Sequence, residues 1–320
     1  MTNEQGFASI GKARFYYHKK KPSNTYRVIV VGGSTVFGMG AFTPEQNLPA
    51  QINEQLQHRS VEVNVEVINA GVPGYTSGLE LLYIMSELIY YDPDLIIAYD
   101  GWNDMVINNE SINEGLCNPL KTVDHLRLER RLNGSYTVIG SARHFLGSVR
   151  GALELKLENL ASYSLLEDIA RKVKGYIFGS YLGSVKFSPC SIEVYRQNLE
   201  HMIFVARRHG FKIALFLQPT MGIDDKELTS DEKVSEAKLD DLELRKLFYE
   251  SARRVFKDLK VRQGNGNTSV CVEDLSYSFK WVTDKVYEDT GHLSLSGNRI
   301  IAKRIIHALD ACHFLMHKGA

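Results

Sequence analysis

The sequence predicts an α/β fold in which a parallel β-sheet is covered by helices on both faces. Short β-branched and apolar runs recur along the chain, and each ends at a glycine or a polar residue. Their continuous apolar character is typical of strands that are buried on both faces. Amphipathic stretches of helical periodicity separate these runs. This alternation of strands and helices is the pattern of a three-layer α/β/α sandwich.

The first predicted strand covers residues 27–31, where the run Arg-Val-Ile-Val-Val is followed by two glycines. Further strands are predicted at residues 65–69, 94–99, 212–217 and 269–272, which gives a sheet of about five strands. Pro44 stands where a helix is expected to start, a position that favours proline. Helices are predicted at residues 44–58, 77–90, 192–209, 237–259 and 296–316.

Two segments interrupt this alternation. Residues 106–188 form a long insertion with leucine-rich helical periodicity, and residues 221–236 are polar and acidic. Both follow the carboxyl ends of predicted strands, the edge at which open α/β sheets bind ligands. Each segment is either a lid or specificity element, or a surface decoration or subunit contact. We expect an N-terminal arm at residues 1–25 and a single domain at residues 26–320, interrupted by the helical insertion, and the oligomeric state stays open.

The composition excludes several classes of binding protein. The chain has 320 residues, with 38 lysines and arginines balanced by 38 aspartates and glutamates. A net charge of zero gives no global field for nucleic acid, so we expect no nucleic-acid partner. No run of about 18 apolar residues is present, so we expect no membrane span in this chain. The polar start of the chain lacks an apolar signal core, so the sequence by itself indicates a soluble, cytoplasmic protein.

The four cysteines, Cys117, Cys190, Cys271 and Cys312, are far apart in the sequence. None are spaced as C-x-x-C, which argues against a zinc ribbon or a thioredoxin-type site. An even number of cysteines permits two disulfides, but so few in a chain of this length do not make a disulfide scaffold. We expect four free thiols and no metal centre.

A glycine-rich turn, residues 32–40, follows the first predicted strand and puts Ser34 at the ligand-binding edge of the sheet. A dinucleotide fingerprint would need a third glycine where Thr43 stands, and a phosphate-binding loop would need lysine in place of Met39. Phosphate binding is therefore poorly supported. Ser34 is either a nucleophile, which would need a general base, or a serine that caps the following turn.

Among the ten histidines, His292 is the best candidate for that base. Asp289 precedes it by three residues, so its carboxylate can reach one imidazole nitrogen and leave the other free for a serine proton. Such a pair is common by chance, and a surface histidine is the alternative. Gly74 and Asn103 lie in loops after the second and third predicted strands. They can supply N–H donors for an oxyanion, or they stabilise turns.

These four blocks of sequence together resemble the SGNH hydrolases, the GDSL-type esterase and lipase superfamily. The family is named for a serine, a glycine, an asparagine and a histidine, and the blocks occur here in the family's order. They read Gly-Gly-Ser-Thr-Val-Phe-Gly around Ser34, Asn-Ala-Gly-Val-Pro-Gly-Tyr-Thr with Gly74, Gly-Trp-Asn-Asp with Asn103, and Asp-Thr-Gly-His from Asp289 to His292.

The resemblance implies a flavodoxin-like sandwich and a serine hydrolase that cleaves carboxylic esters as an esterase, deacetylase or lipase. Ser34 matches the nucleophile, and Asp289 and His292 match the rest of the triad. The oxyanion hole implied by the family consists of Ser34, Gly74 and Asn103. The implied substrate is a small-molecule or glycan ester, and the implied chemistry needs no metal or organic cofactor.

The resemblance covers about residues 26–105 and 190–316, and its nucleophile block departs from the family pattern in two places. Gly33 stands where the family usually has Asp, and Thr35 stands where it usually has Leu. Gly-Gly-Ser-Thr resembles a known variant of the block, whose members often carry an N-terminal anchor. The resemblance therefore also raises an exported or membrane-tethered origin. In the second block, Gly71 is a less favoured match than Gly74.

Two other functions stay open. A sugar hydroxyl instead of water can capture an acyl-enzyme, which would make the protein an O-acetyltransferase that acts on carbohydrate with the same residues. A non-catalytic binding domain that keeps the fold is the second alternative. The intact set of four blocks argues against it.

Overall fold

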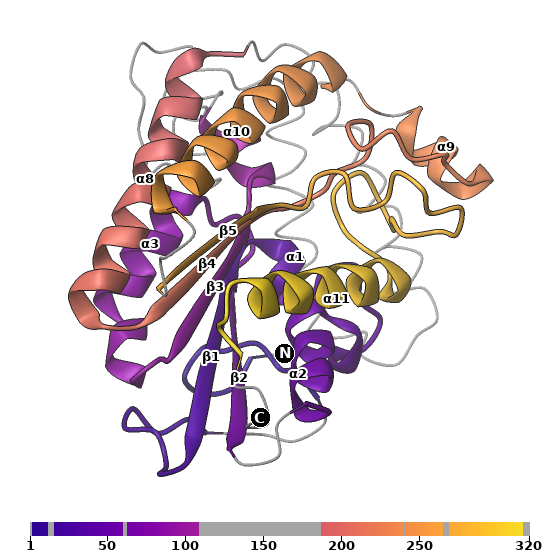
Figure 1. The fold of residues 1–320 in the computed structure, drawn as a ribbon. Helices are drawn as coiled ribbons and strands as arrows, with labels where there is room; N and C mark the ends of the chain where they lie inside the picture. Colours follow the sequence, from indigo (N-terminus) through magenta and orange to yellow (C-terminus); the bar gives the residue numbers. More distant parts are fainter. Residues whose placement is uncertain are drawn as a thin grey trace, which may run out of the picture.

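The computed structural model contains a five-stranded sheet in which all neighbouring strands are parallel, in the order β2-β1-β3-β4-β5 (Figure 1). The structure describes residues 2–11, 16–59, 63–108, 187–237, 239, 241–264 and 269–315. The predicted strands are all present, and the predicted fold class is confirmed. Their bounds are β1 (Thr25–Gly32), β2 (Asn64–Gly71), β3 (Leu95–Asp100), β4 (Lys212–Leu217) and β5 (Val270–Asp274).

The central strands form because both of their faces are buried. Every residue of β3 is buried, and so is every residue of β1 after the first. Alternate side chains of β1 point to opposite faces of the sheet. Ile29 and Val31 pack into one apolar core, and Val28 and Val30 pack into the other. The sheet therefore separates two cores, each of which needs a layer of helices.

Helices cover both faces of the sheet, as Figure 1 shows. The core of Ile29 and Val31 is covered by α3 (Ser77–Ser86), the 3₁₀ turn η2 (Leu88–Tyr91), α8 (Pro189–His209) and α10 (Leu242–Gln263). The opposite core is covered by α2 (Leu48–Gln57) and α11 (Leu295–Ala311). Two short elements, α1 (Ser34–Phe37) and η1 (Pro44–Gln46), precede α2 in the chain. This arrangement is the predicted three-layer sandwich.

Several predicted helices differ from the observed ones. The helix expected at residues 77–90 ends at Ser86, before η2, and the helix expected at residues 296–316 ends at Ala311. The helix expected at residues 44–58 is divided, because the side chain of Asn47 accepts a hydrogen bond from Ala50 N at 2.9 Å and starts a new helix, α2. The helix expected at residues 237–259 begins only at Leu242, and a separate helix, α9 (Ser230–Glu236), precedes it.

The predicted helical insertion at residues 106–188 lies outside the described residues except at its two ends. Residues 106–108 belong to a short π-helix, η3 (Asp104–Asn108), and residues 187–188 lead into α8. The helical character of the insertion and its role as a lid or an interface stay predictions.

The N-terminal arm packs against the edge of the sheet. Phe7 is buried, and its ring makes edge-to-face contacts with Tyr17 and Tyr91. Ala8 forms an antiparallel bridge with Asn69 of the edge strand β2. An uncovered edge strand would offer its unpaired backbone groups to other chains, so the arm protects this edge. The mostly polar arm therefore contains buried aromatic anchors.

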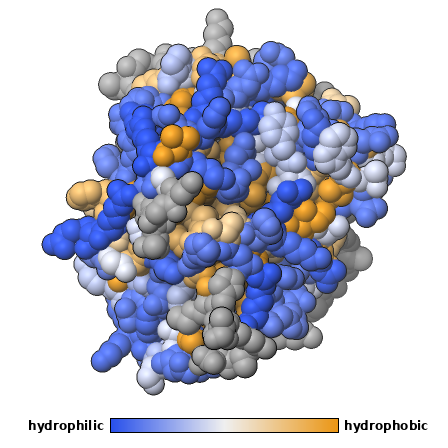
Figure 2. Space-filling view, in the orientation of Figure 1, coloured by the Kyte–Doolittle hydropathy of each residue, from blue (hydrophilic) through white to orange (hydrophobic). Residues whose placement is uncertain are grey.

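No helix in the described part of the chain is long and apolar enough to cross a membrane. Figure 2 shows that the face in view is mostly hydrophilic and that its apolar residues form small separate groups.

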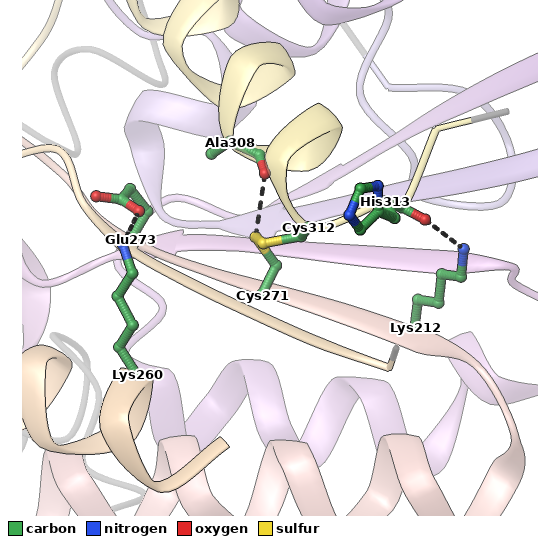
Figure 3. Close-up of a disulfide and its surroundings, with 7 residues drawn as sticks. All are labelled: Lys212, Lys260, Cys271, Glu273, Ala308, Cys312 and His313. Atoms are coloured by element: carbon green, nitrogen blue, oxygen red, sulfur yellow. Dashed lines mark hydrogen bonds and ion pairs between the residues drawn. A yellow bond between two sulfur atoms is a disulfide. The ribbon is translucent and has the colours of Figure 1, made fainter. Parts of the chain in front are cut away.

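The structure corrects the expectation of free thiols. Cys271 in β5 and Cys312 at the end of α11 form a disulfide, with Cα atoms 5.8 Å apart (Figure 3). No cysteine among the described residues is a free thiol. Sequence spacing could not reveal this pair, because the packing of α11 on the sheet brings the two residues together. The bond fastens the last helix to the edge strand β5.

Replacing both residues of this disulfide, Cys271→Ala with Cys312→Ala, is expected to lower the free energy of unfolding by about 4 kcal/mol. The physical reason is that the unfolded chain loses a cross-link across 41 positions and gains conformational freedom. Urea denaturation of both proteins without reductant measures the difference. Alkylation of both thiols in the unreduced, denatured wild type, or an unchanged midpoint, would contradict the disulfide.

Candidate active site

The order of the sheet creates a place for a ligand at the ends of β1 and β3. From β1 the chain crosses to β2 on one side, whereas β3, β4 and β5 lie on the other side. Loops that leave the carboxyl ends of β1 and β3 therefore diverge, and open α/β sheets bind ligands in the crevice between such loops. Ser34 follows β1 and Asn103 follows β3. The topology brings two of the predicted site residues to the same edge.

The chain turns from β1 into α1 through glycines that allow close packing. A Cβ on Gly32 would lie 2.6 Å from the carbonyl oxygen of Tyr99 in β3. A Cβ on Gly71 would lie 2.3 Å from the backbone nitrogen of Phe37, so α1 sits directly on the end of β2. The lack of a side chain at Gly71 therefore allows α1 to pack against β2. Gly74 lies further along, in the loop, with a φ of +83° that favours glycine.

The Ser34 side chain is hydrogen-bonded to His292, which comes from the loop before α11. Oγ of Ser34 lies 2.8 Å from Nε2 of His292, and Nδ1 of His292 lies 2.7 Å from Oδ2 of Asp289. The other carboxylate oxygen of Asp289 accepts hydrogen bonds from the backbone N–H groups of Gly291 and His292, at 2.9 and 2.8 Å. These three predicted residues thus form one hydrogen-bonded chain.

The Asp289 carboxylate is held in its charged form. Partial loss of solvent raises the pKa of Asp289, but other interactions lower it more. These are the hydrogen bond and charge of His292 and the backbone N–H groups of Gly291 and His292. The pKa therefore lies below the ordinary value. A charged carboxylate at Nδ1 favours the tautomer in which Nε2 is free to accept a proton, so the geometry suits proton removal from Ser34.

The Asn103 side chain lies beside the backbone that carries Ser34. Its Nδ2 donates a hydrogen bond to the carbonyl oxygen of Tyr75 at 2.7 Å. A Cβ on Gly33 would lie 2.3 Å from the same nitrogen, so glycine at this position makes room for the amide. Tyr75 directly follows Gly74, and the hydrogen bond therefore ties the loop after β3 to the loop after β2.

A buried hydrogen-bond network joins the same two loops a second time. The Asp104 carboxylate accepts hydrogen bonds from the backbone nitrogen of Ser77 at 3.0 Å and from its Oγ at 2.6 Å. The hydroxyl of Ser77 in turn accepts a hydrogen bond from Nδ2 of Asn198 in α8, at 2.9 Å. Asp104 and Ser77 are completely buried. The relative placement of the two loops is therefore fixed by buried polar contacts, which are costly to break.

Three buried carboxyl groups, those of Glu80, Asp100 and Asp104, interact around the loop that carries Asn103. Burial and the charge of Asp104 raise the pKa of Asp100 to about 8, although a hydrogen bond with Tyr195 opposes the shift. Burial and the charges of Asp100 and Asp104 raise the pKa of Glu80 well above its ordinary value. Asp100 and Glu80 therefore retain protons at neutral pH. Among the described residues, no group of His, Cys, Asp and Glu side chains is arranged to hold a metal ion.

The polar segment at residues 221–236 braces the loop that leads into the last helix. Glu232 of α9 is buried and accepts hydrogen bonds from the backbone N–H groups of Val286 and Tyr287, at 2.9 and 3.0 Å. Nζ of the buried Lys226 lies 2.7 Å from the same carboxylate. Burial raises the pKa of Glu232, but the hydrogen bonds outweigh it and lower the pKa to about 2. This part of the segment is thus structural rather than a free lid.

Sequence analysis did not single out Glu232, although part of its role has a local signal. Thr229 and Glu232 have the spacing of a capping box, and each side chain accepts a hydrogen bond from the backbone nitrogen of the other. This pattern can predict the start of α9. No local pattern gives the contacts of Glu232 with Val286 and Tyr287, which lie more than fifty positions away.

No family model and no curated protein matches the chain. Among solved structures, it is similar to Axe2, an acetylxylan esterase from Geobacillus stearothermophilus, at 14% identity and a TM-score of 0.47, over 92% of this chain and 97% of that chain. It is also similar to the lipase/acylhydrolase from Enterococcus faecalis, at 14% identity and a TM-score of 0.45, over 92% of this chain and 100% of that chain. These likenesses concern the α/β fold alone, and the chemistry of this chain has to be argued from its own residues.

The stability of the protein is expected to depend on the protonated state of Asp100. Its pKa is 3.8 ordinarily and about 8 in the folded protein, so the stability contributed by the buried, protonated carboxyl is full below pH 4 and is lost as the pH rises through 8. Asp100→Asn should remove this loss, which amounts to about 1.4 kcal/mol per pH unit within that window. Urea denaturation at several pH values measures it. The exposed Asp258→Asn serves as control, and equal pH slopes in wild type and Asp100→Asn would contradict the prediction.

Proposed function

We propose that the protein is a serine hydrolase that cleaves carboxylic esters. The observation that carries this proposal is the continuous hydrogen-bonded chain from Ser34 Oγ through His292 to Asp289, with contacts of 2.8 and 2.7 Å. A serine hydroxyl is a weak nucleophile near neutral pH, and a base within hydrogen-bond distance, oriented by a third group, is what activates it. The four blocks of sequence that resemble the SGNH hydrolases contain these same residues.

In the proposed reaction, Ser34 Oγ attacks the ester carbonyl while Nε2 of His292 takes the hydroxyl proton. The tetrahedral intermediate collapses, and His292 gives this proton to the departing alcohol. A water molecule then attacks the acyl-enzyme, His292 takes its proton, and the carboxylic acid leaves as the proton returns to Ser34. Asp289 orients the imidazole and stabilises its protonated form. Side chains and water carry all proton transfers, so the reaction needs no metal or organic cofactor.

The proposed oxyanion hole consists of the backbone N–H groups of Ser34 and Gly74 and the side-chain amide of Asn103. The Asn103 amide has two hydrogens. One is used in the hydrogen bond to the carbonyl oxygen of Tyr75, which fixes the amide and leaves the second hydrogen for a ligand. Glycine at position 33 leaves room for this amide, because a Cβ there would lie 2.3 Å from its nitrogen.

We further propose that the protein works in an oxidising compartment. The disulfide between Cys271 and Cys312 supports this, because disulfides persist mainly outside the reducing cytoplasm. The proposal agrees with the exported or membrane-tethered origin that the Gly-Gly-Ser-Thr block implies, and it replaces the cytoplasmic location that the sequence by itself indicates. A small-molecule or glycan ester is the proposed substrate.

The first expected result is that wild type hydrolyses p-nitrophenyl esters and that Ser34→Ala does not, because the attacking oxygen is removed. Acetate, butyrate and octanoate esters should be compared, since the ranking distinguishes a deacetylase from a lipase. The exposed Ser86→Ala, on α3, is the matched control and should retain full activity. Equal activity in wild type and Ser34→Ala would remove Ser34 from the mechanism. Inactive wild type that transfers acetyl to an added carbohydrate would identify an O-acetyltransferase instead.

A second expectation concerns the oxyanion hole. Asn103→Ala should lower kcat by about 10²–10³ because one donor to the developing negative charge is lost. Steady-state kinetics with p-nitrophenyl acetate measures the change, and the partly exposed Asn53→Ala on α2 is the control. Full turnover by Asn103→Ala would show that the role assigned to this amide is wrong.

A further inference from the structure

Arg245 is a buried cation between α10 and the candidate active site. It lies in the first turn of α10 and is 1% exposed. Its Nε lies 2.6 Å from Oδ1 of Asp241, which is equally buried one turn earlier. This ion pair neutralises the charge and leaves the other nitrogens of the guanidinium for further contacts. A buried charge is costly unless it is paired and hydrogen-bonded, so the buried guanidinium of Arg245 depends on these contacts.

The guanidinium holds the loop that carries Asp289 and His292, called here the triad loop. Nη1 of Arg245 donates a hydrogen bond to the carbonyl oxygen of Thr290 at 2.9 Å. The same oxygen accepts hydrogen bonds from Oγ1 of Thr220 at 2.8 Å and from the backbone nitrogen of Met221 at 3.3 Å. Thr290 lies between Asp289 and His292 in the chain. The backbone between the two residues is thus fixed by several donors, one of which is charged and therefore strong.

The same guanidinium also contacts the loop that carries Asn103. Its central carbon lies 4.0 Å from the centre of the Trp102 ring, a cation–π contact with the residue directly before Asn103. The ring of Trp102 in turn lies close to Gly291, where a Cβ would be 3.4 Å from Cε2 of the ring. Arg245 therefore touches both loops, and the two loops touch each other through Trp102.

We propose that Arg245 is a positioning residue that holds the Asp289–His292 loop and the Trp102–Asn103 loop in one fixed arrangement. The inference rests on the proposed function, since the arrangement matters for the attack of Ser34. Arginine is needed because its planar fork can bind Asp241 and Thr290 while its face stacks on Trp102. A lysine ammonium is a compact point charge and cannot satisfy these contacts together.

The test compares Arg245→Met and Arg245→Lys with a matched control on the same helix. Arg253 also stacks on a ring, that of Tyr277 at 3.8 Å, and also binds a backbone carbonyl, that of Ile223 at 2.9 Å. Among the described residues, no hydrogen bond, ion pair or ring contact joins Arg253 to the triad loop. Both Arg245 variants should lose about 10²-fold in kcat for p-nitrophenyl acetate, because reacting groups displaced by about 1 Å react this much more slowly. KM should change little, and Arg253→Met should retain wild-type kcat.

An activity-independent readout separates this proposal from the proposed function. The imidazole proton shared by His292 Nδ1 and Asp289 should give a far-downfield proton NMR resonance, which is assigned by its absence in His292→Gln. The resonance should shift or broaden in Arg245→Met and stay unchanged in Arg253→Met. A wild type without esterase activity would overturn the proposed function alone, whereas an unchanged resonance and kcat in Arg245→Met would overturn the positioning role alone.

Thr220→Val keeps the proposal testable if the Arg245 variants do not fold. The substitution preserves shape but removes the hydroxyl that donates to Thr290 and accepts a hydrogen bond from Arg245 at 2.8 Å. Thr220→Val should also lower kcat, and circular dichroism checks that the variant is folded.

Chemical rescue is a further test for an Arg245→Ala variant that does fold. Added guanidinium chloride at millimolar concentration should restore part of its kcat. Wild-type kcat in folded Thr220→Val, or no rescue of Arg245→Ala, would contradict the positioning role.

Discussion

Ser34 and His292 share a hydrogen bond although they lie 258 positions apart in the chain. One stands at the carboxyl end of β1 and the other in the loop before α11, so the bond forms only while both ends are fixed on the sheet. The close approach of β1 to β3 at Gly32 fixes the first end. The hydrogen bond from Arg245 to the carbonyl oxygen of Thr290 helps to fix the second. The proposed chemistry requires that the nucleophile Ser34 and the base His292 stay within hydrogen-bond distance of each other.

The site is surrounded by buried ionisable groups that are stabilised in two different ways. Near the triad loop, Arg245 and Glu232 stay charged, and each lies beside a buried residue of opposite charge. Near the Asn103 loop, burial raises the pKa values of Glu80 and Asp100, so these acids stay protonated. Falling pH therefore threatens the triad loop, where the pKa of Glu232 is about 2, and rising pH threatens the carboxyl cluster.

The strands could be predicted from sequence because a strand buried on both faces is a continuous apolar run, as in β1 and β3. The residues of the candidate site could be proposed because three of their blocks follow predicted strands and the fourth precedes the last predicted helix. The disulfide of Cys271 with Cys312 and the contacts of Arg245 and Glu232 could not be predicted, because they join segments that only the packed fold brings together. The capping box that begins α9 was a local signal in the sequence that our prediction did not use.

The central claim is that Ser34 is an activated nucleophile, and covalent labelling tests it most directly. Wild type would be incubated with a serine-directed fluorophosphonate and examined by intact mass and peptide mapping. The account predicts one adduct per chain, on Ser34, and a much slower reaction in His292→Gln, in which the base is lost. An unlabelled wild type, an adduct on another residue, or equal labelling of His292→Gln would contradict it.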